Sequence, residues 1–513
     1  MSVSHKPIRI LQIISGIAIL ASVTLMLDYF DVITLPRFSD FTGTRPVATT
    51  PKKIKRPTIS RSASVQELLD QGAQLMFDRQ YEDAIAAYKA AAEKSPKDAT
   101  IYEKIGDAYF SQRKHDLAHA QYEIAQKLSP TSETLLIKRV RTLIGQRKPL
   151  QARQLLDANT SPSAPVTFYK GLLAAFYNDR DAAQKLFAMV IESGNNQLLQ
   201  TKSQLFLNLY KEFDVAEEAP LTYLQVQLAL AFNHVGEYGL AIDLAFNAVK
   251  NDSVYRDAYL VLGHSFLNEY RWFDAEDAFS KVISLDSTSG AGYFFRGVSR
   301  RELNKPREAI SDFSQAIQNG YRPKIAVEDE LASLYYSLGD LPHAYEYYKH
   351  IVETDPTEIK RFIRPMALAI NQLKKPLEAK ALAERALKAH PNTAMSHNLI
   401  GWAHMANGEL AEARASFDQA RTLDPELPAL SYNIGQLEER IGAVDKARAA
   451  YLKAVEYGKK YNDPGIAYDA QTKFDALANA TATNNAGTSV LSTGAIGTST
   501  PLPPQIVPSL SLE

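Results

Sequence analysis

The stretch GAQLMFDRQYEDAIAAYKAAAEKSP (residues 72–96) reappears 34 positions later as GDAYFSQRKHDLAHAQYEIAQKLSP (residues 106–130), with glycine, alanine, tyrosine and proline at matching places. The alanine of this pattern returns along most of the chain, usually at steps of 34 or 35 residues. A small residue stands twelve positions before nearly every alanine, and a bulky residue usually stands four positions after it. The alanines are Ala84, Ala118, Ala152, Ala183, Ala241, Ala275, Ala309, Ala344, Ala379, Ala413 and Ala447.

This pattern predicts a series of paired helices. Small residues at two fixed places let two helices approach closely, and the bulky residue one turn later on the same face fills the space between them. Proline follows the second helix of several repeats, because it has no amide to donate and disfavours a helical residue before it. Those prolines are Pro96, Pro130, Pro356, Pro391 and Pro425, whereas Val140 breaks the rule of a small residue before the alanine.

In its period and in the order of its small, bulky and proline positions, the chain resembles the tetratricopeptide-repeat family over about 400 residues. The resemblance implies an all-α fold, a right-handed superhelix (an α-solenoid) of helix–turn–helix repeats whose first helices line a concave groove. In that family the groove holds peptide segments, so the resemblance also implies that other proteins are the partners. It indicates a fold rather than a particular task.

The repeats are interrupted once. After Ala183 the next alanine comes 58 residues later, which is one repeat and 24 residues more. We read the surplus as one unpaired helix and a turn. The open end of a solenoid requires a cap with a polar outer face, and a last amphipathic stretch supplies one. The chain is thus divided into an N-terminal array, an inserted helix, a C-terminal array and a capping helix, at 65–197, 198–221, 222–461 and 462–480.

An apolar segment lies near the N-terminus. Residues 10–27 carry no charged side chain, and Lys6 and Arg9 precede them. At about 1.5 Å per residue this run nearly spans a hydrocarbon core of about 30 Å, which predicts a transmembrane helix within an anchor at 1–31. A cleaved signal peptide is the alternative, but no small-x-small cleavage site follows the run. The basic residues before the helix favour a single-pass topology with the repeats outside the cytoplasm, in a periplasm.

Two segments outside the repeats have a different composition. Residues 32–64 form a basic linker that we expect to be flexible, and residues 481–513 consist mostly of Thr, Asn, Ala, Gly, Ser and Pro. The second segment cannot bury enough apolar surface to offset its conformational entropy, so we expect a disordered tail. The basic side chains of the linker are Arg37, Arg45, Lys52, Lys53, Lys55, Arg56 and Arg61.

The composition argues against several kinds of chemistry. The formal net charge is −1, which does not favour nucleic acid binding. The chain has no cysteine, which excludes disulfides, thiol nucleophiles and Cys-ligated metal sites. His115 and His119 have the i, i+4 spacing of a zinc helix, but no third ligand is suggested. Since phosphate-binding loops and nucleophile motifs are also missing, we predict a protein that is not an enzyme and has no catalytic residue, cofactor or metal.

The resemblance implies that positions five and nine of each first helix face the concave groove. In the first two repeats these are Leu69, Ala73, Glu103 and Asp107, which lack the Lys and Asn of a clamp for two carboxylates. Farther along, the same positions are apolar, which predicts either a hydrophobic groove for partner segments or packing between neighbouring repeats. The predicted groove residues are Phe168, Leu172, Val226, Leu230, Leu260, Phe294, Val298, Trp402 and Tyr432.

Together these observations predict a non-enzymatic scaffold tethered to a membrane, which organises cell-envelope proteins for assembly, export or polymer secretion. Two alternatives stay open. One is a cytosol-facing tether that recruits a soluble partner, and the other is an accessory subunit of a separately encoded polymer-synthesis or glycosyl-transfer complex. The expected partners are other proteins and the membrane, without nucleic acid, and self-association is left open.

Overall fold

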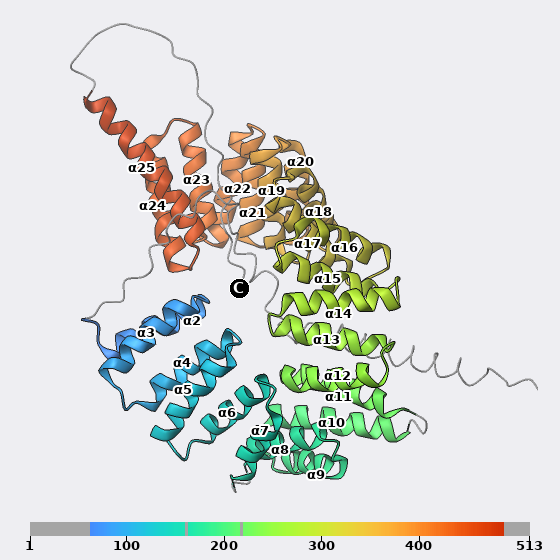
Figure 1. The fold of residues 1–513 in the computed structure, drawn as a ribbon. Coiled ribbons are helices and arrows are strands. Elements are labelled where there is room, and N and C mark those ends of the chain that lie inside the picture. The colour runs from blue at the N-terminus through green and yellow to red at the C-terminus, as the bar shows by residue number, and fades with distance from the viewer. Residues whose placement is uncertain (1–61, 160–162, 216–218, 487–513) are drawn as a thin grey trace, which may run out of the picture. The chain divides into compact units, whose positions relative to one another are not determined.

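The computed structural model describes residues 62–159, 163–215 and 219–486, and within these ranges the chain is helical and has no strand. The predicted all-α fold is confirmed for this part of the chain. Successive helices follow one another as antiparallel pairs (Figure 1). The helices form two compact units, an N-terminal unit that ends at Val327 and a C-terminal unit that begins at Glu328.

The N-terminal unit consists of four helix pairs, a single helix and three further pairs. The first four pairs are α2 (Val65–Phe77) with α3 (Tyr81–Lys94), α4 (Ala99–Ser111) with α5 (His115–Leu128), α6 (Glu133–Gly145) with α7 (Pro149–Asp157), and α8 (Ala164–Phe176) with α9 (Arg180–Glu192). The single helix is α10 (Gln197–Val215). The later pairs are α11 (Leu221–Val235) with α12 (Tyr238–Asn251), α13 (Arg256–Asn268) with α14 (Trp272–Leu285), and α15 (Gly290–Glu302) with α16 (Pro306–Gln318).

The C-terminal unit begins inside α17 (Lys324–Ser337), which pairs with α18 (Leu341–Thr354). The first helix of its next pair is irregular: it is divided into η2 (Ile359–Phe362), α19 (Ile363–Ala367) and η3 (Leu368–Gln372). This helix contains Pro365, which has no amide for an intrahelical hydrogen bond. The remaining helices are α20 (Pro376–Ala389), α21 (Ala394–Ala406), α22 (Leu410–Leu423), α23 (Pro428–Arg440), α24 (Val444–Lys460) and α25 (Pro464–Ala486).

Local sequence explains where several helices begin. The Ser64 hydroxyl accepts a hydrogen bond from the Glu67 amide (3.2 Å), and the Glu67 carboxylate accepts one from the Ser64 amide (2.6 Å), so α2 begins with a capping box. Pro149 and Pro306 stand at the first positions of α7 and α16, where the missing amide would have had no intrahelical partner. These ends therefore need no tertiary contact to define them.

Within most pairs an aromatic ring of the second helix lies against a glycine of the first. A Cβ atom added to Gly72 would lie 2.3 Å from the Tyr88 ring, and one added to Gly106 would lie 2.4 Å from the Tyr122 ring. No side chain fits in that space, so glycine is what lets the ring in. The predicted interlocking of small and bulky positions is thus confirmed. The same contact joins Gly171 to Phe187, Gly263 to Phe279, Gly297 to Phe313, Gly401 to Phe417 and Gly435 to Tyr451.

The pair of α6 and α7 lacks this glycine–aromatic contact, as its sequence indicates. Val140 stands at the glycine position and is buried, and the bulky partner is the fully buried Leu156. The second helix of this pair, α7, is only nine residues long. This pair is therefore the irregular one among the first four.

Helix α10 follows the fourth pair without a partner helix of its own. The sequence predicts an inserted helix at 198–221, and the structure shows α10 ending at Val215. Its Phe206 is fully buried, stacks on Phe187 with 4.7 Å between ring centroids, and lies 5.5 Å from the ring of Phe232 in α11. The helix thus continues the core of the N-terminal unit, and the boundary between the two compact units lies inside α17 instead.

The predicted transmembrane helix at 10–27 and nearly all of the linker lie outside the described residues. Among the helices that the structure describes, none is both long enough and apolar enough to cross a membrane. Helix α25 continues to Ala486, beyond the predicted end of the cap at 480. The rest of the predicted tail lies outside the described residues.

Candidate interaction surfaces

The nine predicted groove residues do not share one environment. In the N-terminal unit five of them are buried and pack between helices, while Leu230 of α11 and Leu260 of α13 are half-buried. The packing interpretation therefore describes most of the row in this unit, and peptide binding by these side chains stays a prediction. The buried five are Phe168, Leu172, Val226, Phe294 and Val298.

The contacts of Phe294 show how firmly this row belongs to the core. Its ring stacks on Tyr321 with 4.3 Å between centroids and an interplanar angle of 13°, and it lies 5.5 Å from the ring of Phe313. Phe168 likewise lies 5.9 Å from the ring of Phe187 in the next helix. Both side chains therefore contribute to the packing between helices of their unit.

The two groove residues of the C-terminal unit are different. Trp402 of α21 and Tyr432 of α23 stand on the first helices of successive repeats, and both remain partly exposed. Trp402 packs against a buried cluster that includes Phe417 and Leu430, and the Tyr432 ring lies 5.7 Å from Tyr451. Each ring is therefore fixed at one side and open at another, which is the usual setting of an aromatic anchor.

Polar groups surround the Tyr432 ring. Burial raises the pKa of Tyr432 to about 12, and the nearby Asp469 carboxylate acts in the same direction. Burial, and next the charge of Asp463, raise the pKa of Asp469 to about 6. At neutral pH the site therefore offers a phenol that can donate a hydrogen bond and a carboxylate, on α25, that is short of stabilising partners.

The acidic positions of the second repeat are already paired. The Lys138 ammonium of α6 lies 2.7 Å from a Glu103 oxygen and 2.6 Å from an Asp107 oxygen, and the Tyr122 hydroxyl donates a hydrogen bond to Asp107 (2.7 Å). Burial, and next the Asp107 charge, raise the pKa of Tyr122, which stays neutral. This cluster links α4, α5 and α6, and its single ammonium is shared by two carboxylates.

A second set of charged side chains joins parts of the N-terminal unit that are far apart in the sequence. The Arg141 guanidinium of α6 donates a hydrogen bond to Glu237 in the turn after α11 (3.0 Å). The Tyr169 hydroxyl of α8 donates to the same carboxylate oxygen (2.8 Å), and both Tyr169 and Glu237 are buried. Burial, and next the Glu237 charge, raise the pKa of Tyr169 well above its usual value, so Tyr169 remains a donor.

Two further side-chain pairs extend this contact. Arg147 Nε donates a hydrogen bond to Asp243 of α12 (2.6 Å), and His115 Nε2 lies 2.9 Å from a Glu269 oxygen. The turns after α4 and α6 thus meet the turns after α11 and α13, and α6 lies next to α12 (Figure 1). We call this contact the edge seam. Sequence reasoning missed it, because its partners are 96 to 154 residues apart and no local signal joins them.

His115 and His119, which have the i, i+4 spacing of a zinc helix, each contact another protein side chain. His115 is buried in the seam, and the His119 ring nitrogen lies 2.7 Å from the Thr142 hydroxyl oxygen. Throughout the described part of the chain, no three His, Asp or Glu side chains gather as a metal ion would require.

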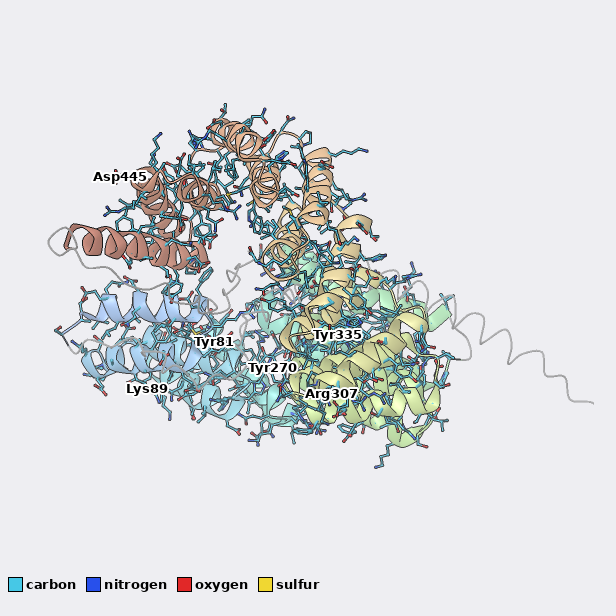
Figure 2. The ribbon with its side chains drawn as sticks, turned by 90° about the horizontal axis from the view of Figure 1, so that it is seen from above. Tyr81, Lys89, Tyr270, Arg307, Tyr335 and Asp445 are labelled. Carbon is cyan, nitrogen blue, oxygen red and sulfur yellow. The ribbon has the colours of Figure 1, made fainter. Side chains whose placement is uncertain are left out.

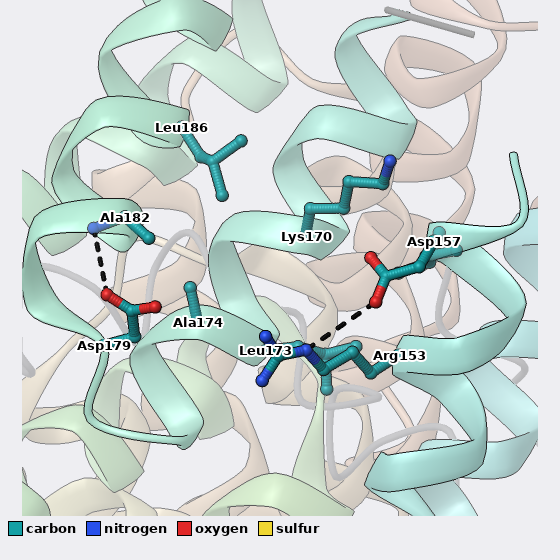
Figure 3. Close-up of a pocket in the computed structure, with 9 residues that line it drawn as sticks. Arg153, Asp157, Lys170, Leu173, Ala174, Asp179, Ala182 and Leu186 are labelled. Atoms are coloured by element: carbon teal, nitrogen blue, oxygen red, sulfur yellow. Dashed lines mark hydrogen bonds and ion pairs between the residues drawn. The ribbon is translucent and has the colours of Figure 1, made fainter. Parts of the chain in front are cut away.

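Two small cavities lie where the regular pairing is interrupted. One, of about 120 Å³, is bordered by α7, α8 and α9 and lined by Arg153, Lys170 and Leu186 (Figure 3). The other, of about 300 Å³, lies between the end of α8, α11 and α12 and includes Phe176 and Leu224. Ligand pockets commonly measure about 300–1,000 Å³, so the first is too small and the second is at the lower limit.

Models of the tetratricopeptide repeat match residues 69–133, 330–358, 372–428 and 416–464, so matched repeats occur in both compact units. A search of curated protein sequences found no match.

Solved structures that resemble the chain do so at low sequence identity. The TPR protein YrrB is 16% identical, with 36% of this chain and 95% of that chain covered and a TM-score of 0.31. Yeast Tom70 is 15% identical, with 82% and 96% covered and a TM-score of 0.28, and PilF of Pseudomonas aeruginosa is 19% identical, with 43% and 98% covered and a TM-score of 0.30. All three scores are below 0.5, so the assignment rests on the repeat models and on the helix pairs themselves. The matched segments are tetratricopeptide repeats, and the described helices around them form pairs of the same kind.

Proposed function

We propose that this protein is a non-enzymatic scaffold that binds segments of partner proteins on the first helices of its C-terminal unit, around Trp402 and Tyr432. One observation carries the proposal. The aromatic members of the predicted row are buried in the N-terminal unit, as Phe168 and Phe294 show, whereas Trp402 and Tyr432 are only partly buried. Partly exposed Trp and Tyr side chains on a fixed support are the residues that most often dominate a protein interface.

The chemistry around these rings suits an apolar segment with a hydrogen-bonding group. The ring faces bury apolar area, and the neutral Tyr432 phenol and the Gln436 amide, one helical turn later, provide hydrogen bonds. A donor on the partner would also compensate the Asp469 carboxylate. The preferred partner is therefore a segment that places an aliphatic or aromatic residue beside a donor such as an amide or an amine.

The test compares proteins that copurify with the full chain and with single variants, followed by affinity measurements on the partner so identified. We expect Trp402→Ala to weaken binding by about 2 kcal/mol or more, because truncated aromatic anchors commonly have this effect. Tyr432→Phe, which removes only the hydroxyl, should weaken it by about 1 kcal/mol. Tyr468→Ala is the matched control, because Tyr468 is 65% exposed on α25. A partner that binds the Trp402→Ala protein as tightly as the wild type would move the site elsewhere.

The proposal includes a membrane anchor at 10–27 with the repeats on the extracytoplasmic side, where the scaffold would organise proteins for assembly, export or polymer secretion. The charge-free run of 18 residues and the basic residues before it support this placement. A cytosol-facing tether and an accessory subunit of a polymer-synthesis complex would use the same binding surface. The identity of the copurifying partner separates these roles.

A further inference from the structure

The turns that join paired helices have a common backbone feature. Each contains one residue in the left-handed conformation, and in several turns it is a residue that adopts this conformation readily: Asn178, Gly236, Asn304, Gly339, Gly408 and Gly442. In the edge seam the same place holds Arg113, Arg147 and Tyr270, with φ of 58°, 58° and 59°. A residue with a side chain costs about 1–2 kcal/mol in this conformation. Such strain persists where the surrounding contacts maintain it.

These strained residues are the ones that reach across the seam. The Arg113 guanidinium lies over the rings of Tyr238 and Tyr270, at 5.1 and 5.7 Å from their centroids. The Arg147 guanidinium, besides its bond to the Asp243 carboxylate, lies 5.3 Å from the Phe246 ring. Cation–π contacts of this kind add about 0.5–2 kcal/mol each. In these three turns the unfavourable conformation coincides with contacts that exist only when the seam is closed, whereas Arg79, in the turn between α2 and α3, and Lys374 have the same conformation in turns outside the seam.

A turn outside the seam supplies the comparison. Lys374 has the same conformation, with φ of 56°, in the turn before α20. Its ammonium donates a hydrogen bond to the Asn371 carbonyl of its own turn (2.8 Å). A basic residue at this position therefore does not by itself make a long-range contact, and the seam contacts belong to Arg113 and Arg147.

The two edges of the seam also fit each other in shape and charge. A Cβ atom added to Gly239 would lie 2.1 Å from the Ile144 carbonyl oxygen, so the backbones of α6 and α12 touch at this point. Tyr81 and Tyr270, both labelled in Figure 2, lie near one end of the seam. Burial, and next the proximity of Tyr270, raise the pKa of Tyr81. The basic edge consists of Arg113, Arg141 and Arg147, and the acidic edge of Glu237, Asp243 and Glu269.

We infer that the edge seam is an electrostatic clasp, which holds the N-terminal unit closed and opens when its charges are screened or reversed. In the closed form repeats two and three are held against the two repeats that follow α10. In the open form the arginine edge and the Tyr169 phenol become accessible while each helix pair keeps its own core. The clasp thus controls which part of the N-terminal unit a partner can reach. This inference is independent of the site proposed at Trp402 and Tyr432.

The experiment measures a distance across the seam in the full chain. Because the chain has no cysteine, Ala120→Cys in α5 and Asp277→Cys in α14 accept one spin label each, and both residues are exposed. Double electron–electron resonance should show one narrow short distance in low salt. In about 1 M salt, where the Debye length is about 3 Å, the Arg147–Asp243 pair, whose guanidinium is the most exposed of the seam, should be weakened first, and a longer and broader component should appear. Asp243→Arg should produce that component in low salt, since it places two like charges together.

The swap Arg147→Asp with Asp243→Arg restores an opposite-charge pair and should recover most of the short distance. Lys374→Asp is the matched control, with the same turn conformation and no seam partner, and it should leave the distance unchanged. Circular dichroism checks that each variant is folded. A folded Asp243→Arg protein with the wild-type distance overturns the clasp, and so does a Lys374→Asp protein that opens equally. If the single variant does not fold, the folded swap decides: recovery of the short distance supports the clasp, and its loss overturns it.

Discussion

Equivalent positions of the repeat have different roles in the two units. Phe294 stands at the fifth position of its first helix and is 4% exposed, inside a stack with Tyr321. Tyr432 stands at the same position of a later repeat and is partly exposed. An aromatic residue at this position can therefore be fully enclosed by the core or remain partly exposed. The neighbouring side chains decide it, through the space that they leave.

Phe294→Ala tests the core role. The substitution removes a ring that is packed on two sides, so we expect the free energy of unfolding of its region to fall by about 3–5 kcal/mol. Hydrogen exchange of the full chain, read on α15 and α16, measures the effect locally. Phe273→Ala is the control, because Phe273 is 68% exposed, and it should change stability by less than about 1 kcal/mol. Similar effects of the two substitutions would contradict the core assignment.

Asp469 predicts a pH dependence in α25. Its pKa is raised to about 6 in the folded protein, chiefly by burial, while an unfolded Asp titrates at about 3.9. Between these values the folded state binds more protons, so the contribution of Asp469 to stability falls as the pH rises from about 4 to 6 and stays low above that. Asp469→Asn has no carboxyl group to ionise, so its stability should not fall in this pH range.

Hydrogen exchange of α25 measures the prediction for Asp469. At pH 7 the Asp469→Asn protein should be more stable by about 1 kcal/mol, allowing for solvent screening of a half-exposed carboxyl group, and at pH 4 the difference should nearly vanish. Asp475→Asn, at an exposed position of the same helix, is the control. An advantage of the same size at both pH values would show that burial of the charge is not the cause.

Among the elements, the helix pair is the unit that the repeat pattern describes. The glycine of one helix admits the aromatic ring of the other, and the fully buried alanine, such as Ala309 of α16, lets the two backbones approach. Where the pattern weakens, as at Val140, the pair survives with Leu156 as its bulky residue. Small departures are therefore absorbed within one pair.

Ala309→Leu should disturb one pair and its neighbours. The added methylenes have no space between α15 and α16, and overpacking typically costs about 1–3 kcal/mol. The loss should appear as faster hydrogen exchange in α14 to α17, while α2 and α25 keep their protection, because a repeat contacts mainly its neighbours. Ser311→Leu, at an exposed position of α16, is the matched control. Loss of protection along the whole chain would contradict local unfolding.

At the scale of the whole molecule, the described helices form two compact units. The N-terminal unit contains the edge seam, a contact between distant repeats, and the C-terminal unit contains the proposed binding surface. Outside the described residues, the predicted anchor at 10–27 would connect both units to a membrane. The proposed scaffold therefore combines an attachment, a unit with a charged seam and a unit with partly exposed aromatic side chains.

The anchor predicts that the full chain stays in the membrane fraction after high-salt and alkaline washing, and that deletion of residues 1–31 releases a folded protein. Leu377→Cys reports the side of the membrane, because Leu377 is 75% exposed in α20 and the chain has no other cysteine. A membrane-impermeant maleimide should label it before lysis, once any outer membrane is permeable. Labelling only after lysis would favour the cytosol-facing tether, and a full chain in the soluble fraction would exclude the anchor.

Sequence by itself determined the all-α class, the helix pairs and the glycine–aromatic contacts. It could do so because these contacts join residues about half a repeat apart, and the alanine that marks the repeat occurs eleven times along the chain. Tertiary structure alone decided that Phe294 is core while Tyr432 is partly exposed, and that Arg147 meets Asp243. The physical reason is that the path of a solenoid sums many small rotations between neighbouring repeats, so which distant edges meet is not written in any one of them.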